Sequence, residues 1–73
     1  MKKIMIVEDD KVIREELIDL LKGANYQTSF VRDFANSFNE IIDAKADLII
    51  LDINIPYTNG EILLKNIRKS LGV

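Results

Sequence analysis

The chain alternates three short runs of apolar, aromatic or β-branched residues with three longer stretches whose apolar residues recur at helical spacing. The short runs cover residues 3–7, 26–31 and 47–52, and their length and composition predict β-strands. The longer stretches cover residues 11–23, 34–44 and 60–71, and each predicts an amphipathic helix. Because a helix follows each strand after a short connection, the pattern predicts a layered α/β fold with a parallel sheet and right-handed crossovers.

The spacing of the apolar residues also predicts which face of each helix packs against the sheet. In the first helix, Arg14 and Asp19 fall on the side opposite the apolar stripe. The expected inner stripes consist of Ile13, Leu17, Leu20, Leu21 and Ala24 in the first helix, Phe34, Phe38, Ile41 and Ile42 in the second, and Leu63 or Leu64, Ile67 and Leu71 in the third.

Capping residues predict where the helices begin and end. Short polar side chains accept hydrogen bonds from the free N–H groups at a helix start, and glycine or asparagine favours a helix end. The second helix has two candidate starts, Asp33 and the capping box Ser37-x-x-Glu40. The other expected boundaries are Asp10 and Asn59 as N-caps, with Gly23 and Asn25, and then Gly72, as stops.

Residues 47–60 contain an unbroken apolar run, Leu48–Leu51, which is followed directly by Asp52. An unbroken run of this kind predicts a strand that is buried on both faces at the centre of the sheet. Pro56 cannot donate to a ladder and Asn59-Gly60 favours a turn or a cap, so the strand ends before them. Ligands of open α/β sheets bind beyond the carboxyl ends of the strands, so Asp52 lies where a functional carboxylate is expected.

Composition narrows the chemistry that the chain can perform. Its 73 residues are 48% hydrophobic and 30% charged with a net charge of −2, which indicates one small globular domain without general attraction to nucleic acid or anionic membranes. The sequence contains neither a signal peptide nor a membrane-spanning stretch, so a cytoplasmic location is expected. Cysteine and histidine are both absent, so a bound metal would take oxygen ligands, which favours magnesium, manganese or calcium over zinc.

Three carboxylates follow two of the predicted strands. Glu8 and Asp9 come directly after the first strand, and Asp52 comes after the third. If these strands are neighbours, the carboxylates converge in one crevice, where their mutual repulsion would raise at least one pKa. Mg²⁺ fits such a site, and a carboxylate beside the metal can act as a nucleophile toward phosphorus to give an aspartyl phosphate.

Each of these residues also has a structural interpretation. Asp10 is better explained as a helix cap than as a ligand. Asp52 taken alone is equally well explained as a turn residue, and its combination with Glu8 and Asp9 favours the functional interpretation. The basic residues of the last helix are typical of a solvated face; they are Lys65, Arg68 and Lys69.

Two motifs resemble a known family, the receiver domain of two-component response regulators. They are Val7-Glu8-Asp9-Asp10-x-x-x-Arg14 and Asp47-x-x-x-x-Asp52-x-Asn54-x-Pro56-x-x-x-Gly60. The resemblance implies a flavodoxin-like fold with strand order 2-1-3, and transfer of a phosphoryl group from a sensor histidine kinase to Asp52. It also implies a Mg²⁺ site made by Glu8, Asp9, Asp52 and the main-chain carbonyl of Asn54, beside a loop shaped by Pro56 and Gly60.

The same resemblance bears on activity and partners. A receiver accepts a phosphoryl group and is not an enzyme, beyond self-phosphorylation and self-dephosphorylation of the complete domain. The Glu8-Asp9-Asp10 cluster and the segment Arg14-Glu15-Glu16-Leu17 resemble receivers attached to DNA-binding output domains. Any contact with DNA would therefore be made through an output domain that these 73 residues do not contain.

The sequence departs from the family in length. Family members have about five β/α units, whereas this chain has three, so we expect the N-terminal three-fifths of a receiver. The Thr or Ser that ends the fourth strand and the Lys of the fifth are not in the sequence, so the chain should lack switch competence. With order 2-1-3 the strand 47–52 becomes an edge, and bare edges and helix faces predict self-association, most simply as a dimer.

Two alternatives remain open at this stage. In the first, the chain is a structural or self-assembling half-domain in which the acidic site is a relic, and Mg²⁺ would produce no change. In the second, the chain is a phosphohydrolase of the haloacid-dehalogenase type, which also uses an Asp nucleophile at a strand end. That class needs a second Asp two residues later, where this sequence has Asn54.

Overall fold

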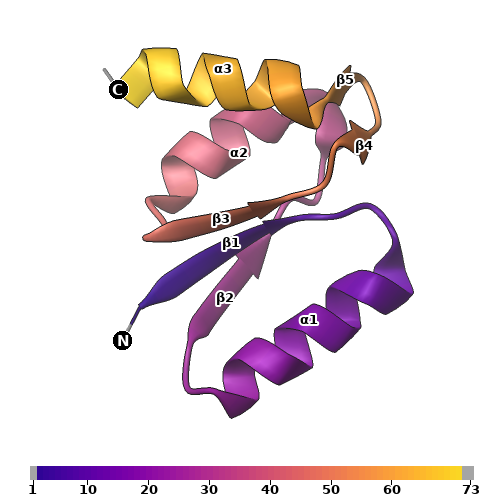
Figure 1. Cartoon of the computed structure of the whole chain (residues 1–73), viewed down its shortest axis with the longest axis vertical. Coiled ribbons are helices and arrows are strands. Elements are labelled where there is room, and N and C mark those ends of the chain that lie inside the picture. The colour runs from indigo at the N-terminus through magenta and orange to yellow at the C-terminus, as the bar shows by residue number, and fades with distance from the viewer. Residues whose placement is uncertain (1, 72–73) are drawn as a thin grey trace.

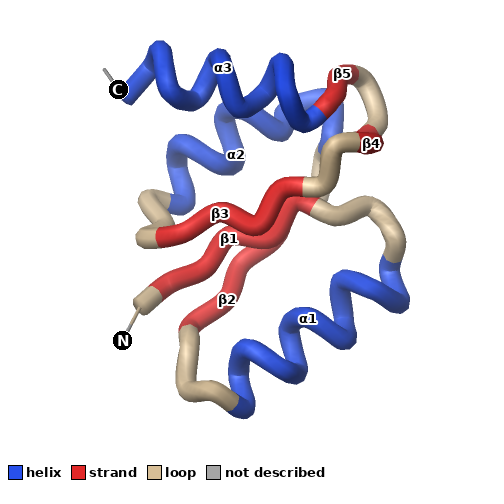
Figure 2. Tube along the Cα trace, viewed as in Figure 1, coloured by secondary structure: helices blue, strands red, loops and turns tan. Residues whose placement is uncertain are grey.

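The computed structural model describes residues 2–71, and it shows a three-stranded parallel sheet with helices on both faces (Figure 1). One helix covers one face of the sheet, and the other two helices lie together on the opposite face (Figures 1 and 2). The main elements are β1 (Lys3–Val7), α1 (Lys11–Gly23), β2 (Gln27–Phe30), α2 (Ser37–Ala44), β3 (Leu48–Leu51) and α3 (Gly60–Leu71). The predicted α/β architecture is confirmed, and β1 and α1 have the predicted bounds.

The sheet has the order β2-β1-β3, which confirms the expected order 2-1-3. In the register of the sheet, Ile4 of β1 lies beside Thr28 of β2 on one side and Leu48 of β3 on the other. The four residues Ile4–Val7 are each at most 3% exposed, so β1 is the strand buried on both faces. Since β3 pairs with β1 alone among the described strands and Leu48 is 56% exposed, the prediction that run 48–51 marks the centre was wrong.

The main hydrophobic core lies between the sheet and the α2–α3 layer. Successive residues of a strand point to opposite faces, so Met5 and Val7 face this core while Ile4 and Ile6 face α1. The buried members of the core are Met5, Val7, Val31, Ile41, Ile55, Leu63 and Ile67. The core therefore joins β1 to α2 and α3.

Helix α1 packs loosely, and its inner face shares Leu17 and Leu21 with the predicted stripe but is rotated away from the rest of it. None of its residues is fully buried, and the least exposed ones recur at helical spacing as Arg14, Leu17, Ile18 and Leu21. Ile13 and Leu20, which were expected to face inward, are 48% and 72% exposed, and Ala24 is exposed as well. The long stem of Arg14 takes the inner position instead, because an arginine can cover apolar surface while its charged end finds polar partners.

The N-cap predictions for α1 and α3 are confirmed. The Asp10 carboxylate accepts hydrogen bonds from the N–H groups of Val12 and Ile13, at 2.9 and 3.1 Å. The Asn59 side-chain oxygen accepts one from the N–H of Ile62 at 2.9 Å. Just beyond the end of α1, Asn25 has a φ of 73°, the left-handed conformation that favours asparagine.

The predicted capping box of the second helix is wrong. Asp33 caps a short 3₁₀ turn, η1 (Phe34–Asn36), and α2 begins after it at Ser37. The Glu40 carboxylate accepts hydrogen bonds from the N–H groups of Arg32 and Asp33, at 3.1 and 2.8 Å. Glu40 therefore ties the connection after β2 to α2, while the N–H of Ser37, which the box would pair with Glu40, donates to the carbonyl of Phe34.

A small hairpin precedes α3 and was not predicted. It pairs β4 (Asn54–Ile55) with β5 (Thr58–Asn59), and Tyr57 in its turn has a φ of 72°.

In α3, Leu63 and Ile67 are 2% and 4% exposed, while Leu64 is 39% exposed, so Leu63 is the inward residue of the two candidates. The side chain of Leu71 and the predicted stop at Gly72 lie outside the described residues. Among the helices of residues 2–71, none combines the length and apolar character needed to cross a membrane.

Candidate functional site

Three carboxylates meet at the carboxyl edge of the sheet, as the sequence predicted. Glu8 and Asp9 follow β1 and Asp52 follows β3, and these strands are adjacent and parallel. The N–H of Asp52 donates to the carbonyl of Val7 at 3.0 Å, which extends the ladder to the first residue of the site. One carboxylate oxygen from each of the three residues lies within 4.8 Å of the others.

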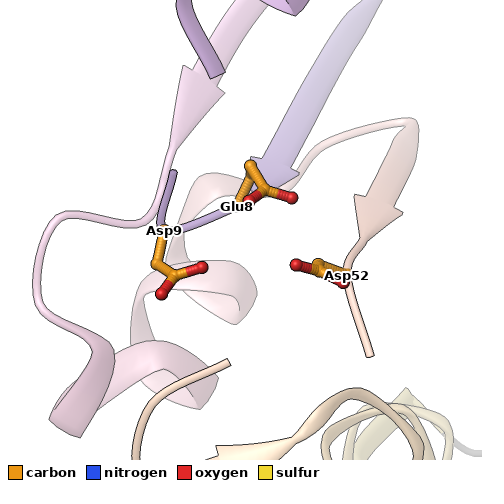
Figure 3. A group of neighbouring side chains, drawn as sticks. All are labelled: Glu8, Asp9 and Asp52. Atoms are coloured by element: carbon orange, nitrogen blue, oxygen red, sulfur yellow. The ribbon is translucent and has the colours of Figure 1, made fainter. Parts of the chain in front are cut away.

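The carboxylates of Asp9 and Asp52 face each other across a shared space, and the Glu8 carboxylate borders the same space (Figure 3). Glu8 and Asp52 are half-buried and Asp9 is exposed. Asp10 is not part of this group, because its carboxylate caps α1. The structural interpretation of Asp10 is therefore confirmed.

Backbone N–H groups orient the two half-buried carboxylates. The N–H of Asp10 donates to Glu8 Oε1 at 3.1 Å, and the N–H of Asn54 donates to Asp52 Oδ1 at 3.3 Å. The second bond brings the backbone of Asn54 beside Asp52. The predicted role of the Asn54 carbonyl as a metal ligand stays a prediction.

Gly60 holds the start of α3 against the backbone that carries Asp52. Its N–H donates to the carbonyl of Ile53 at 2.8 Å. A Cβ at this position would lie 2.5 Å from the carbonyl oxygen of Asp52 and 2.8 Å from the Cα of Ile53. Only glycine allows this approach, which gives a physical reason for the residue that the motif places here.

The electrostatics of the site raise the pKa of Glu8 above its ordinary value. Burial of the carboxyl group is the largest cause, and the hydrogen bond from the N–H of Asp10 partly opposes it. A hydrogen bond with Asp52 and the negative charges of Asp52 and Asp9 raise the pKa further. The site therefore concentrates negative charge that its neighbours do not balance.

This raised pKa predicts a pH dependence of stability in metal-free solution. Because the folded state holds the proton of Glu8 more tightly than the unfolded state, the contribution of Glu8 to the free energy of unfolding falls as pH rises from about 4.5, its ordinary pKa, through the folded pKa. We expect Glu8→Gln to remove this component and to stabilise the fold at about pH 7 by roughly 0.2–1 kcal/mol. Urea unfolding with a chelator at about pH 4 and about pH 7 measures the effect, and an equal or lower stability of Glu8→Gln at the higher pH would contradict it.

The donor set fits a hard divalent cation. Three carboxylates offer oxygen ligands and no soft or nitrogen ligands, which is the chemistry that Mg²⁺ prefers. Opposite oxygens around an octahedral Mg²⁺ lie about 4.2 Å apart, since each Mg–O distance is about 2.1 Å. The spacing of up to 4.8 Å is slightly wider, so the carboxylates would move slightly closer together around a bound Mg²⁺.

The basic residues singled out in the sequence lie in two places, on the surface of α3 and beside the acidic site. Lys65, Arg68 and Lys69 are exposed on α3, as their structural interpretation predicted. Arg14 is a residue of the site's surroundings that sequence reasoning placed on the outer face of its helix. Its Nη1 donates to the carbonyl of Glu8 at 3.3 Å, and the only signal for this in the sequence is its fixed place in the first motif.

The fold and the site define a class: an α/β domain with an acidic, oxygen-ligand site at the carboxyl edge of a parallel sheet. The model of the response regulator receiver domain matches residues 4–72 of this sequence. The chain therefore belongs to the receiver-domain family of two-component signal transduction. Receiver domains of response regulators are regulatory modules and not typical enzymes.

Similar sequences include named response regulators and transcriptional regulators. The chain is 39% identical over 69 residues to the transcriptional regulatory protein YxdJ of Bacillus subtilis, a match that covers 94% of this chain and 30% of that protein. It is 28% identical over 72 residues to the DNA-binding response regulator MtrA of Mycobacterium tuberculosis, with 99% and 32% of the two chains covered. The chain thus spans about a third of the length of these relatives.

Similar solved structures confirm the fold. The response regulator TrrA of Thermotoga maritima in complex with Mg²⁺-BeF matches with a TM-score of 0.87 and 31% identity, covering 96% of this chain and 61% of that one. TrrA in complex with the histidine kinase ThkA matches with a TM-score of 0.83 and 32% identity, covering 94% and 60%. The chain therefore spans about three-fifths of the length of these structures.

Proposed function

We propose that this chain is a phosphoacceptor module in which Asp52 receives a phosphoryl group from a sensor histidine kinase. Glu8, Asp9, Asp52 and the main-chain carbonyl of Asn54 are the proposed Mg²⁺ ligands. The observation that carries the proposal is the meeting of three carboxylates, within 4.8 Å of one another, at the ends of two adjacent strands in a chain of this family. Support comes from the TrrA structures, one in complex with Mg²⁺-BeF and one in complex with a histidine kinase.

Each residue of the site has a separate role in the proposed phosphoryl transfer. A carboxylate oxygen of Asp52 attacks phosphorus in line, an O–P bond forms, and the bond to the donor breaks with its electron pair leaving on the donor atom. The N–H of Asn54 restricts rotation of the Asp52 carboxylate through the bond to Oδ1. Glu8 and Asp9 hold the metal, and bound Mg²⁺ supplies charge neutralisation for the incoming phosphoryl oxygens.

Reaction with acetyl phosphate tests the proposed function directly. We expect intact-protein mass spectrometry to show at most one phosphoryl group per chain, only in the presence of Mg²⁺, and at a slow rate. The rate is slow because the phosphoryl group adds negative charge beside a site whose recorded charges are already negative. Labelling that persists in a chelator, or no labelling after prolonged incubation, would contradict the proposal.

Binding of Mg²⁺ should appear as added stability. A concentration ten times the Kd stabilises a folded protein by about 1.4 kcal/mol, which corresponds to roughly 6–11 °C in Tm for a chain of this size. Asp9→Ala should abolish this shift, whereas Asp43→Ala, an exposed acid of α2 outside the cluster, should keep it. A wild-type Tm that does not respond to Mg²⁺ would favour the alternative of a structural module with a relic site.

Self-association is proposed for the 73-residue chain on the basis of exposed apolar surface. Among the described strands, β3 pairs on one side only, and its other edge carries Leu48. A groove of about 380 Å³ beside it runs toward α1, lined by Lys2, Ile4, Leu21, Tyr26, Asp47, Leu48 and Ile50. Pairing of two β3 edges would cover this surface and satisfy backbone groups in a symmetric dimer. Sedimentation at micromolar concentration should show a dimer that Leu48→Lys shifts toward monomer. A cooperatively folded monomer of the wild type at all concentrations would refute the idea.

Contact with DNA and cellular location are properties of a whole response regulator, and this chain is similar to one part of such proteins. MtrA is named a DNA-binding response regulator, and this chain spans 32% of its length. We propose that any DNA contact of this protein is made by a separate output segment, since the chain has a net charge of −2. The proposed partnership with a histidine kinase supports a cytoplasmic location for the site.

A further inference from the structure

Arg14 is a charged side chain in a position where an apolar one would pack more simply. It lies on the inner face of α1 and is half-buried, and its Nε is fully buried with no hydrogen-bond partner among the described residues. A buried donor without a partner costs about 1–3 kcal/mol. A methionine would fill similar space without that cost, so packing alone does not explain an arginine here.

The guanidinium of Arg14 joins two parts of the fold. Its Nη1 donates to the carbonyl oxygen of Glu8 at 3.3 Å, and its Cζ lies 4.8 Å from the ring centroid of Phe30. Phe30 is the last residue of β2, beside Ile6 in the register of the sheet. The ring attracts the cation and limits its orientations, and the cation in turn binds the connection between β1 and α1.

That connection carries two of the three carboxylates of the site. The peptide group between Glu8 and Asp9 is planar, so a fixed Glu8 carbonyl also fixes the plane that contains the Cα atoms of both residues, and it limits the positions from which both side chains start. A second contact, from the N–H of Asp10 to Glu8 Oε1 at 3.1 Å, sets the position of the Glu8 carboxylate. Asp10 is itself held by its role as the cap of α1, so α1 anchors the connection at two points.

Arg14 acts on this connection through the backbone and not as a counter-charge. Among the described residues, the hydrogen bond of its guanidinium goes to the main-chain carbonyl of Glu8 and not to a carboxylate of the site. The acidic group therefore stays available for a cation while its backbone is held in place.

We infer that Arg14 is a positioning residue of the acidic site, which orients Glu8 and Asp9 by binding the Glu8 carbonyl while Phe30 orients its guanidinium. The inference rests on the proposed metal-binding function and assigns one more residue to it. Residues that orient metal ligands are typically worth 10–100-fold in metal affinity.

The test is Arg14→Met with Arg32→Met as its matched control. The Arg32 guanidinium also lies over Phe30, with its Cζ 5.1 Å from the ring centroid. Among the described residues, however, the guanidinium that donates a hydrogen bond to the β1–α1 connection is that of Arg14. We expect Arg14→Met to weaken Mg²⁺ binding about tenfold in isothermal titration, and Arg32→Met to leave it unchanged. In metal-free solution the unfolding free energy of Arg14→Met should be equal to or higher than that of the wild type, because the buried donor without a partner is gone.

A second measurement reports the position of Glu8 without any metal. The amide of Asp10 is hydrogen-bonded to the Glu8 carboxylate, so its hydrogen exchange should be faster in Arg14→Met than in the wild type or Arg32→Met. Arg14→Lys gives a second variant if the methionine variant does not fold. Lysine keeps the charge but lacks the planar fork, so Mg²⁺ affinity and Asp10 protection should both fall partway.

The outcomes separate this inference from the proposed function. Wild-type Mg²⁺ affinity and wild-type Asp10 protection in both Arg14 variants would overturn the inference. A loss of stability with unchanged Mg²⁺ affinity would also overturn the inference, because it would show that Arg14 contributes to packing and not to the position of the metal ligands. If the wild type binds no Mg²⁺, the proposed function fails, and the exchange of the Asp10 amide still decides whether Arg14 positions Glu8.

Discussion

Asp52→Asn is expected to abolish phosphoryl incorporation from acetyl phosphate completely. The amide that replaces the carboxylate is not a nucleophile toward phosphorus, and the acidic group loses one of its three negative charges. The fold should persist, because the asparagine oxygen can still accept the hydrogen bond from the N–H of Asn54. Intact-protein mass spectrometry after incubation with the donor and Mg²⁺ measures the result.

Asp47→Asn is the matched control, because Asp47 precedes β3 and Asp52 follows it. The Asp47 carboxylate accepts a hydrogen bond from the N–H of Lys3 at 2.8 Å, which the amide oxygen of asparagine can also accept. This variant should incorporate the phosphoryl group at the wild-type rate. Equal labelling of Asp52→Asn and the wild type would show that another residue is the acceptor.

Gly60→Ala is expected to lower the free energy of unfolding by about 3 kcal/mol, near the upper end of what overpacking usually costs. The added Cβ would meet backbone atoms of Asp52 and Ile53 at 2.5 and 2.8 Å, and backbone cannot move aside as a flexible side chain can. Relief of the clash must separate α3 from the backbone that carries Asp52. Urea unfolding measures the loss, and a Mg²⁺ titration should show weaker binding in the same variant.

Gly23→Ala is the control for this substitution. Apart from its chain neighbours and the nearby backbone of α1 itself, no atom lies within 4 Å of a Cβ built at Gly23, the last residue of α1, so the change creates no clash. Alanine there should stabilise the fold by about 0.4–1 kcal/mol by restricting the unfolded chain. A loss of stability of similar size at both glycines would show that the close approach at Gly60 is not the cause.

The elements that sequence reasoning located well are those fixed by local chemistry. The bounds of β1 and α1 follow from an apolar run, a helical period and the Asp10 cap, all within a few neighbouring residues. The acidic site was predictable for a related reason. Carboxylates that follow adjacent parallel strands must meet at one edge, so neighbouring strands were sufficient to bring Glu8 and Asp52 together.

The features that sequence reasoning missed depend on contacts distant in the chain. The runs in β1 and β3 are equally apolar, and only the pairing of the whole sheet decides which one is central. Leu20 fits the helical period as well as Ile18 does, but Arg14 occupies the inner side over Phe30 and sets the face. The strands of the hairpin before α3 have two residues each, too few to show a period.

The central place of β1 in the sheet has a consequence for the order in which the molecule assembles. Ile4 pairs with Thr28 and Leu48, partners that a ribosome adds 24 and 44 residues later. Local elements such as α1 can form early. The chain segments between the paired strands must close first, which is slow and costs entropy, and only then do the contacts of the sheet stabilise the fold. The edge that joins Glu8 to Asp52 therefore cannot exist until β3 has been made, so the acidic site forms later than local elements such as α1.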